Sequence, residues 1–267
     1  MARLEVCDPS GAVILDSDDI HLGLISSGHL PLERTIERME RWAINSPTYH
    51  PNGVFDLVRG VSVTASTPLV FIRGRGVLQS IERAGGVSTY WYAHTTESTR
   101  YYAFDKMSDR GGGAKLQLLN ASSIVTLDSD QTFLNIRGSS APPGPTPQGY
   151  VYAGGATWDE PNSGHIRERS TFCEYTVNVG VPCAAALPWV RSMFHSDYMG
   201  NGATGAREGC YGRDNDIVFC AATEAGCHMN TVPVGTAGIG RFFSIPASRI
   251  PVATYIDIRE YPFPYAV

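Results

Sequence analysis

The stretch of sequence that decides the fold lies near the start of the chain and occurs a second time in its middle. The first copy reads LEVCDPSGAVILDSD at residues 4–18, and the second reads LQLLNASSIVTLDSD at residues 116–130. Both copies share Leu, Ser, Val, Leu, Asp, Ser and Asp at equivalent positions, and Leu22 matches Leu134 just beyond them. Each copy has the order strand, polar turn, strand and acidic turn. Because internal repeats reveal the architecture of a chain, the segment predicts a duplicated β unit.

Each copy has the chemistry of a β-hairpin. In the first, Pro9 presets φ for the turn and Gly11 tolerates a positive φ. In the second, residues 120–123 supply a turn of weaker propensity. The Asp-Ser-Asp that follows each hairpin can hydrogen-bond its own backbone, so it is expected to end the second strand.

A weaker match suggests that the duplication extends beyond the hairpins. Residues 61–68 read VSVTASTP and residues 175–182 read YTVNVGVP, at nearly the same offset. Both are alternating strands that end at a proline. The alternative is that only the hairpin recurs, by convergence on a stable β-ribbon.

The composition is that of an all-β protein with many turns. The chain has 267 residues with 28 glycines and 17 prolines, and its β-branched and aromatic residues lie in short runs between turn formers. We therefore expect two related antiparallel β-sandwich-like modules, each opening with a β-hairpin, and little helix. Residues 32–43 carry apolar side chains at helical spacing, so a short helix and an exposed strand are both open there.

The triple glycine at 111–113 is the expected module boundary, which gives an N-terminal β module at 1–112 and a C-terminal β module at 113–267. The second module carries a Pro-rich segment at 138–149 and Gly/Cys-rich insertions. If only the hairpin recurs, the boundary belongs at the Pro-rich segment. In the first module, strands are expected at 54–57, 61–65, 69–72, 77–81, 89–94 and 100–104, and the last two, with their aromatic runs, are expected to form a hairpin.

Charge and hydropathy restrict the partners. The net charge is −5 and Lys/Arg runs are absent, so a nucleic-acid groove is not expected. No apolar stretch approaches the roughly 18 residues that span a bilayer. The segment at 1–5 leads at once into a strand and lacks the apolar core of a signal peptide, so synthesis and folding in a cytoplasm are expected.

The cysteines are concentrated in the last part of the chain. Cys7 stands alone, and the others are Cys173, Cys183, Cys210, Cys220 and Cys227. Free thiols that pack as small apolar side chains, one or two disulfides, or a metal site with His228 remain open alternatives.

The sequence lacks the motifs of the common enzyme classes, including the nucleophile elbow, the phosphate-binding loop and the zinc-protease helix. We therefore expect no catalytic residues, no cofactor and no resident metal. Acidic pairs at 159–160 and at Asp214 and Asp216, together with aromatic residues of the second half, leave a carbohydrate-binding or carbohydrate-cleaving protein as the alternative.

The hairpin sequence at 4–17 resembles the opening of small minor tail proteins of long-tailed bacteriophages. Residues 101–105, the Gly-rich spacer and residues 115–136 are also similar to tail-tip proteins of that group. The resemblance covers about half of the chain, mainly 3–26 and 99–137. It implies a structural virion component at a tail tip, baseplate or fibre-attachment point, used as a trimer or ring with other tail proteins and in contact with a bacterial surface receptor where it mediates attachment. It implies no catalytic residues.

Two regions are candidates for contacts with partners. Gly-rich segments at 196–213 and 221–240 are expected to form loops on a rigid scaffold, with residues for host contact or assembly at Tyr198, Asn201, Arg207, Tyr211 and Asp214. The extended Pro-aromatic tail, with Tyr261, Phe263 and Tyr265, is expected to be either an assembly strap or a packed edge.

Overall fold

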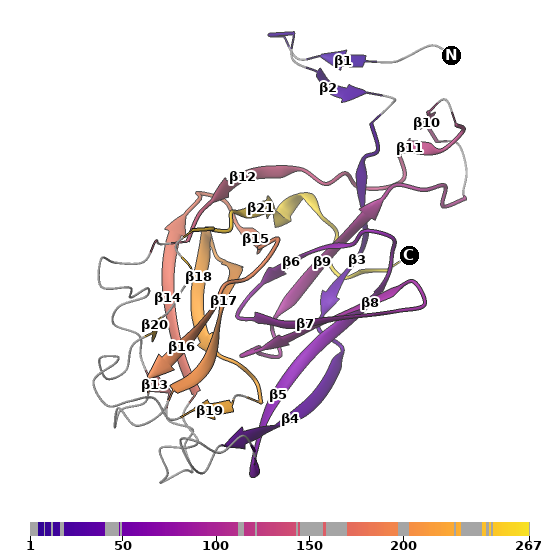
Figure 1. Cartoon of the computed structure of the whole chain (residues 1–267). Coiled ribbons are helices and arrows are strands. Elements are labelled where there is room, and N and C mark those ends of the chain that lie inside the picture. Colours follow the sequence, from indigo (N-terminus) through magenta and orange to yellow (C-terminus); the bar gives the residue numbers. More distant parts are fainter. Residues whose placement is uncertain are drawn as a thin grey trace.

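The computed structural model confirms that the chain is all β, built mainly from antiparallel strands with a single described helical turn, η2 (Ile258–Glu260). Its strands form two hairpins and a body of curled sheets (Figure 1). The structure describes residues 5–7, 9–11, 13–16, 19–40, 48, 50–111, 115–120, 122–142, 144, 157–158, 170–196, 203–226, 228–230, 242–243, 246 and 248–266.

The strands before the triple glycine form copy one. They are β1 (Glu5–Cys7), β2 (Val13–Asp16), β3 (Leu22–His29), β4 (Leu32–Glu40), β5 (His50–Thr64), β6 (Leu69–Arg73), β7 (Val77–Ala84), β8 (Val87–Ala93) and β9 (Arg100–Lys106).

The strands after it form copy two. They are β10 (Gln117–Leu119), β11 (Val125–Asp128), β12 (Ile136–Ser140), β13 (Thr157–Trp158), β14 (Ser170–Asn178), β15 (Cys183–Ala186), β16 (Ser192–Ser196), β17 (Ala203–Arg213), β18 (Asp216–Thr223), β19 (His228–Asn230), β20 (Phe242–Phe243), β21 (Ala253–Asp257) and β22 (Tyr265–Ala266).

The two copies open with hairpins of the same register, as the repeat predicts. In β1–β2, Glu5 pairs with Asp16 and Cys7 with Val13. In β10–β11 the pairs are Gln117 with Asp128 and Leu119 with Val125, which are the residues that the repeat aligns with those of β1–β2. The irregularity before Cys7 recurs before Leu119. The hairpin prediction is therefore confirmed, and the structure adds that the two hairpins share the position of a bulge.

The turns of the two hairpins also share their backbone conformation. Gly11 has φ +86°, and Ser123, which is the equivalent residue, has φ +62°. An L side chain is disfavoured in this left-handed region, whereas glycine adopts it readily. The second copy thus keeps the turn geometry of the first without its favoured residue.

The duplication continues through the body of the protein. In copy one, β9 lies between β3 and β6, and in copy two β21 lies between β12 and β15. A register shift between Leu24 and Ser26 recurs, at the offset of the hairpins, between Ile136 and Gly138. These two three-stranded groups are therefore equivalent, which excludes the alternative that only the hairpin recurs.

The second sheet of each copy is duplicated in the same way. The order β4-β5-β8-β7 in copy one corresponds to β13-β14-β18-β17 in copy two. In both, a two-residue turn joins the last two strands, at Gly85–Gly86 and at Asp214–Asn215. The resemblance between residues 61–68 and 175–182 reflects equivalent positions, since Thr64 and Asn178 both stand opposite the residue after this turn. Copy two adds β16, β19 and β20.

The two copies are joined into one body. Ile72 of β6 pairs with Ala185 of β15, which extends the two three-stranded groups into one sheet of order β3-β9-β6-β15-β21-β12. Equivalent segments also meet before β12, where Leu24 N–H donates to Thr132 O and Leu134 N–H donates to Leu22 O, both at 2.8 Å. The two copies therefore contact each other at two places along this sheet.

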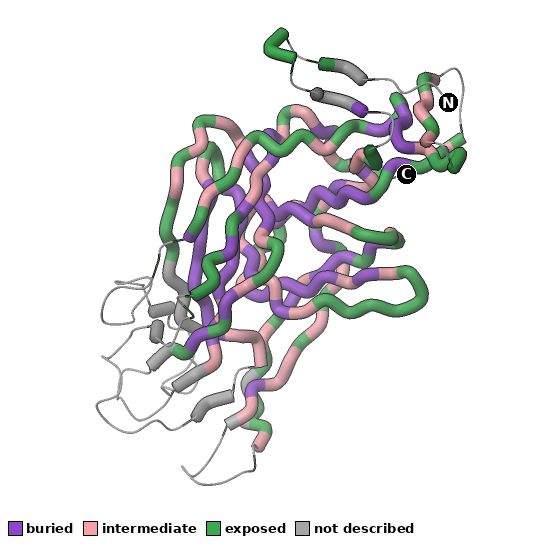
Figure 2. Tube along the Cα trace, turned by 45° about the horizontal axis from the view of Figure 1, so that its top comes forward, coloured by how far each residue is buried: buried purple, intermediate pink, exposed green. Residues whose placement is uncertain are grey.

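Buried residues run through the joined body (Figure 2), and their clusters include residues from both sides of the boundary at residue 112. The largest cluster combines copy-one residues such as Val61 and Tyr92 with Tyr211 and Cys220 of copy two. A second cluster fills copy two, and a third lies against the shared sheet. The boundary between modules 1–112 and 113–267 stays a prediction. Because the clusters contain residues of both copies, each copy needs the other to bury its core side chains.

One open alternative is decided and two expectations are corrected. Of the helix and the strand left open at 32–43, residues 32–40 form the strand, β4, which pairs with β5. The aromatic runs do not form a hairpin, because β8 pairs with β5 and β7 whereas β9 pairs with β3 and β6. The expected strands at 54–57 and 61–65 are one strand, β5.

Candidate functional site at the hairpin end

Both hairpins lie at the same end of the molecule, beyond the body of sheets (Figure 1). Each is a two-stranded sheet. Large apolar side chains are exposed on the second hairpin, at Leu116, Leu119 and Ile124. We call these three residues the hairpin-end patch. Exposed apolar groups gathered in one region mark an interaction surface, and two-stranded sheets offer free edges for pairing.

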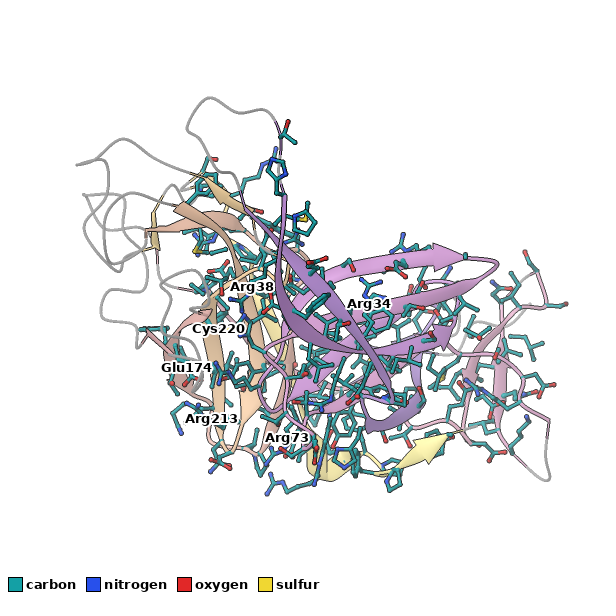
Figure 3. All side chains as sticks on the ribbon, turned by 90° about the horizontal axis from the view of Figure 1, so that it is seen from below. Arg34, Arg38, Arg73, Glu174, Arg213 and Cys220 are labelled. Atoms are coloured by element: carbon teal, nitrogen blue, oxygen red, sulfur yellow. The ribbon has the colours of Figure 1, made fainter. Side chains whose placement is uncertain are left out.

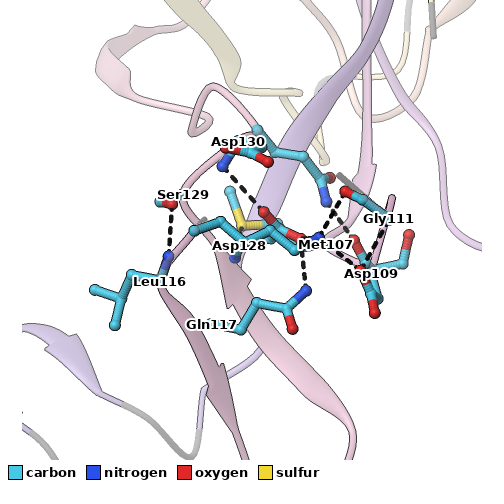
Figure 4. Close-up of polar contacts among 11 residues, drawn as sticks. Met107, Asp109, Gly111, Leu116, Gln117, Asp128, Ser129 and Asp130 are labelled. Atoms are coloured by element: carbon cyan, nitrogen blue, oxygen red, sulfur yellow. Dashed lines mark hydrogen bonds and ion pairs between the residues drawn. The ribbon is translucent and has the colours of Figure 1, made fainter. Parts of the chain in front are cut away.

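A buried carboxylate anchors the second hairpin to the body (Figure 4). Asp128 is fully buried and accepts hydrogen bonds from Lys115 Nζ at 3.0 Å and Gln117 Nε2 at 2.8 Å. Its other carboxylate oxygen accepts from the backbone N–H of Asp130 at 3.0 Å, which ends β11 as the Asp-Ser-Asp motif predicts. Its own backbone N–H donates to Met107 Sδ, so the cluster links the hairpin to the end of copy one.

The side chains of this cluster stabilise one another's ionised forms. Burial opposes ionisation of Asp128, but hydrogen bonds from Gln117, Asp130 N–H and Lys115 outweigh it and lower the pKa of this carboxyl. The hydrogen bond from Lys115 lowers the pKa of Asp109 to about 2, and that bond also raises the pKa of Lys115. The cluster therefore consists of ionised groups at neutral pH, which suits anchoring rather than proton transfer.

The expected contact loops are placed differently from the sequence interpretation. The segment 203–213 is strand β17, not a loop, because it pairs with β16 and β18 along its length. Arg207 pairs with Glu224 at 2.5 Å and donates to Gln79 O, so it connects the two copies. Tyr198 and Asn201 lie outside the described residues.

Tyr211 is in the core and cannot contact a host, which corrects that prediction. Its side chain is 1 % exposed, and its hydroxyl donates to Glu174. Burial raises its pKa. Arg213 donates to the same carboxylate at 2.7 Å, and Figure 3 shows Arg213 and Glu174 together near Arg73 and Cys220. Sequence reasoning missed this core position because a tyrosine in a Gly-rich segment resembles an exposed loop residue.

Asp214 stays at the surface, in the two-residue turn after β17. Its φ is +49°, and its carbonyl accepts from Cys183 N–H at 3.1 Å and from Arg73 Nη1 at 3.4 Å. Asp216 follows the turn and accepts from Asn178 Nδ2 at 2.7 Å. These contacts give the acidic pair a structural role in shaping the turn. The pair at 159–160 lies outside the described residues.

The Pro-aromatic tail packs against its own chain. Tyr261 is 5 % exposed, its ring lies 5.1 Å edge-on from Phe104, and its hydroxyl accepts from Asn135 N–H at 2.7 Å. Phe263 and Tyr265 border the same cluster. The packed edge is thus the alternative that the structure shows, and removal of the tail is expected to disturb the fold.

The four cysteines whose side chains the structure describes are free thiols. Cys183, Cys210 and Cys220 are buried, and Cys7 is exposed. Burial raises the pKa of Cys183 to about 11 and that of the other two buried thiols well above the usual value, so they are unreactive. Cys227 lies outside the described residues, as does the environment of the Cys173 side chain.

Other chemistry is sparse in the described part of the chain. There, no three or more His, Cys, Asp or Glu side chains are grouped so as to hold a metal ion. The helix found within it is too short to cross a membrane. A cavity of about 170 Å³ lies between the copies, with mainly aliphatic walls, Tyr90, Tyr92 and one charged side chain, Arg83. This lining can hold apolar atoms but supplies no acid–base pair.

The anchoring residues Lys115, Asp109 and Gln117 were not found by sequence reasoning, because none belongs to a recognised motif. The match of Asp16 with Asp128 was the available signal, since both residues end their hairpins and both are buried. Comparison of the chain with protein-family models, with curated proteins and with solved structures finds no match.

Proposed function

We propose that this protein is a structural component of a bacteriophage tail tip or baseplate, where it assembles with other tail proteins. The observation that carries the proposal is the pair of equivalent hairpins at one end of a duplicated β body, with the hairpin-end patch on the second. The resemblance of residues 3–26 and 99–137 to tail-tip proteins covers these same hairpins.

The physical argument is that isolated two-stranded hairpins are marginally stable in water. Such a hairpin is stabilised when a neighbour covers its apolar side chains and pairs with its free edges. The exposed Leu116, Leu119 and Ile124 therefore suit contacts between subunits, in the trimer or ring that the resemblance implies. A role in host attachment stays a prediction that depends on Tyr198 and Asn201.

The experiment is to test incorporation into virions. Purified particles from a phage that encodes this chain are examined by mass spectrometry and by labelling of a tagged copy. We expect the protein at the tail tip, and we expect Leu119→Asp with Ile124→Asp to reduce incorporation while the isolated protein keeps its β-sheet circular dichroism. Phe55→Asp, a change of an equally exposed ring on β5, is the matched control. Particles that lack the protein altogether would refute the proposal.

A further inference from the structure

In copy one, the outer edge of the shared sheet is covered by the C-terminal tail. Strand β22 pairs with β3, with Tyr265 opposite Ser27 and Ala266 opposite Ser26. Ser27 Oγ also donates to the carbonyl of Pro262 at 2.7 Å. The tail therefore adds a strand to this edge and fixes its register with a side-chain hydrogen bond.

The tail also covers the face beside that edge. The Phe263 ring lies 4.3 Å from the Arg100 guanidinium, 5.3 Å from His29 and 6.0 Å from Tyr102. In the cluster that the tail borders, Leu24 is 0 % exposed. An extended segment with alternating aromatic and proline residues is thus the natural cover for this surface of the repeat.

Copy two has the same edge without such a cover among its described residues. The offset of the repeat makes Gly138 and Ser139 of β12 equivalent to Ser26 and Ser27. Every described pairing of β12 is with β21, and its side chains are exposed or half-buried. The side chain that would hold an incoming carbonyl is present, because Ser139 stands where Ser27 binds Pro262.

The face beside this edge is apolar and exposed. Ile136, the equivalent of Leu24, is 49 % exposed, and Val252, the equivalent of Arg100, is 48 % exposed. Ile136 pairs with Ile256, so Val252 lies about 13 Å along the neighbouring strand at the usual rise per residue. A segment of four to five extended residues would cover both side chains.

The chain's own tail cannot be the occupant while it serves copy one. Tyr261 is buried against Phe104, and Phe263 is held by Arg100, so release of the tail would uncover the core of copy one. No other segment that the structure describes pairs with the outer edge of β12, and a segment of another polypeptide can occupy this edge.

We infer that the β12 edge, with Ile136, Ser139 and Val252, binds an extended proline- and aromatic-containing segment of a different protein by strand addition. Main-chain hydrogen bonds supply affinity in this mode, and pockets for alternate side chains supply specificity. The inference rests on the equivalence of the two copies and does not depend on the proposed role in a phage tail.

The test uses the full chain and a labelled peptide with the sequence of residues 259–267, REYPFPYAV, as a probe of this chemistry. We expect saturable binding by fluorescence anisotropy. Ile136→Asp with Val252→Asp is expected to weaken binding about tenfold or more, since loss of one buried apolar side chain costs about that factor in affinity. Both positions are half-exposed, so the fold should be kept, which circular dichroism checks.

Two controls make the result specific. Phe55→Asp, which lies on β5, should leave binding unchanged, and a peptide with Phe263 and Tyr265 replaced by serine should not bind. Absence of binding to the unchanged chain, or binding that the double variant does not weaken, would overturn the inference, the latter because the peptide would then be displacing the tail from copy one. Sedimentation that shows dimers abolished by the double variant would also overturn it, because the occupant would then be a second copy.

Discussion

Copy one and copy two share a strand plan but complete it differently. In copy one the outer edge strand β3 is covered by the tail, and Leu24 is buried there. In copy two the equivalent strand β12 exposes Ile136. Copy two instead adds β16, β19 and β20 around its other sheet. Strand register is the same in the two copies, whereas the segments that cover the strands differ.

This difference shows which features the duplicated unit needs. Hairpin register, the bulge in the edge strand and the two-residue turn are retained because a change in any of them would shift side chains between faces. The covering segments are free to change, since each copy needs only enough burial to be stable. Surfaces left without a cover are then available for partners.

The largest expected effect concerns a buried ion pair that copy two has and copy one lacks. Arg191 and Glu208 are both fully buried and bonded at 2.6 and 2.8 Å, whereas Leu78 is the residue of β7 equivalent to Glu208. Glu208→Leu leaves the guanidinium buried without this carboxylate and should cost about 3–5 kcal/mol in the free energy of unfolding.

Urea denaturation measures that cost. The double variant Arg191→Met with Glu208→Leu imitates the apolar chemistry of copy one and should recover most of the loss, because replacing both partners removes the buried charge. A double variant no more stable than Glu208→Leu would show that the two copies differ here in more than charge.

The next effect concerns the cover of copy one. Tyr261→Ala removes a ring buried against Phe104, together with the hydrogen bond from Asn135, and should cost about 3–5 kcal/mol. Thermal and urea unfolding measure it. Tyr265→Ala, at a half-exposed position of the same tail, is the control and should cost less. Equal effects would mean that strand pairing, rather than the buried ring, holds the tail.

The anchoring of the second hairpin should depend on pH. Because Asp109 and Asp128 have lower pKa values in the folded protein than the usual 3.8, their contribution is complete above about pH 4 and is lost as pH falls toward about 2. The amide signals of Gln117 and Thr126 in NMR spectra should report this loosening. In the Asp128→Asn variant the hairpin should be loosened already at neutral pH. If this variant shows the same pH transition as the unchanged chain, Asp128 does not anchor the hairpin.

The smallest expected effect concerns the stability of the two hairpin turns. Ser123→Gly should stabilise the second hairpin by about 1 kcal/mol, because glycine adopts a positive φ without the cost that a side chain incurs. Gly11→Ser should destabilise the first by a similar amount. Hydrogen exchange of the hairpin amides measures both changes. A loss of protection in Ser123→Gly would indicate that the serine side chain itself holds the turn.

Much of the fold could be read from local patterns. The match of residues 4–18 with 116–130 predicted both hairpins, and the apolar runs at 69–72 and 77–81 predicted β6 and β7. The pairing of the aromatic strands could not be predicted, because β8 and β9 are adjacent in sequence but pair with different strands, β5 and β7 against β3 and β6. The candidate site was harder still to predict, because Lys115 bonds both Asp109 and Asp128 and no sequence motif predicts these contacts.

The sequence by itself determined the repeat, the all-β class and the turn of each hairpin, because these depend on residues near one another in the chain. Only the tertiary structure decided that Tyr211 and Tyr261 are buried, that the two copies share one sheet through Ile72 and Ala185, and that Ile136 is exposed where Leu24 is not. Burial depends on which distant segments pack against a residue, and equivalent residues of the two copies meet different neighbours.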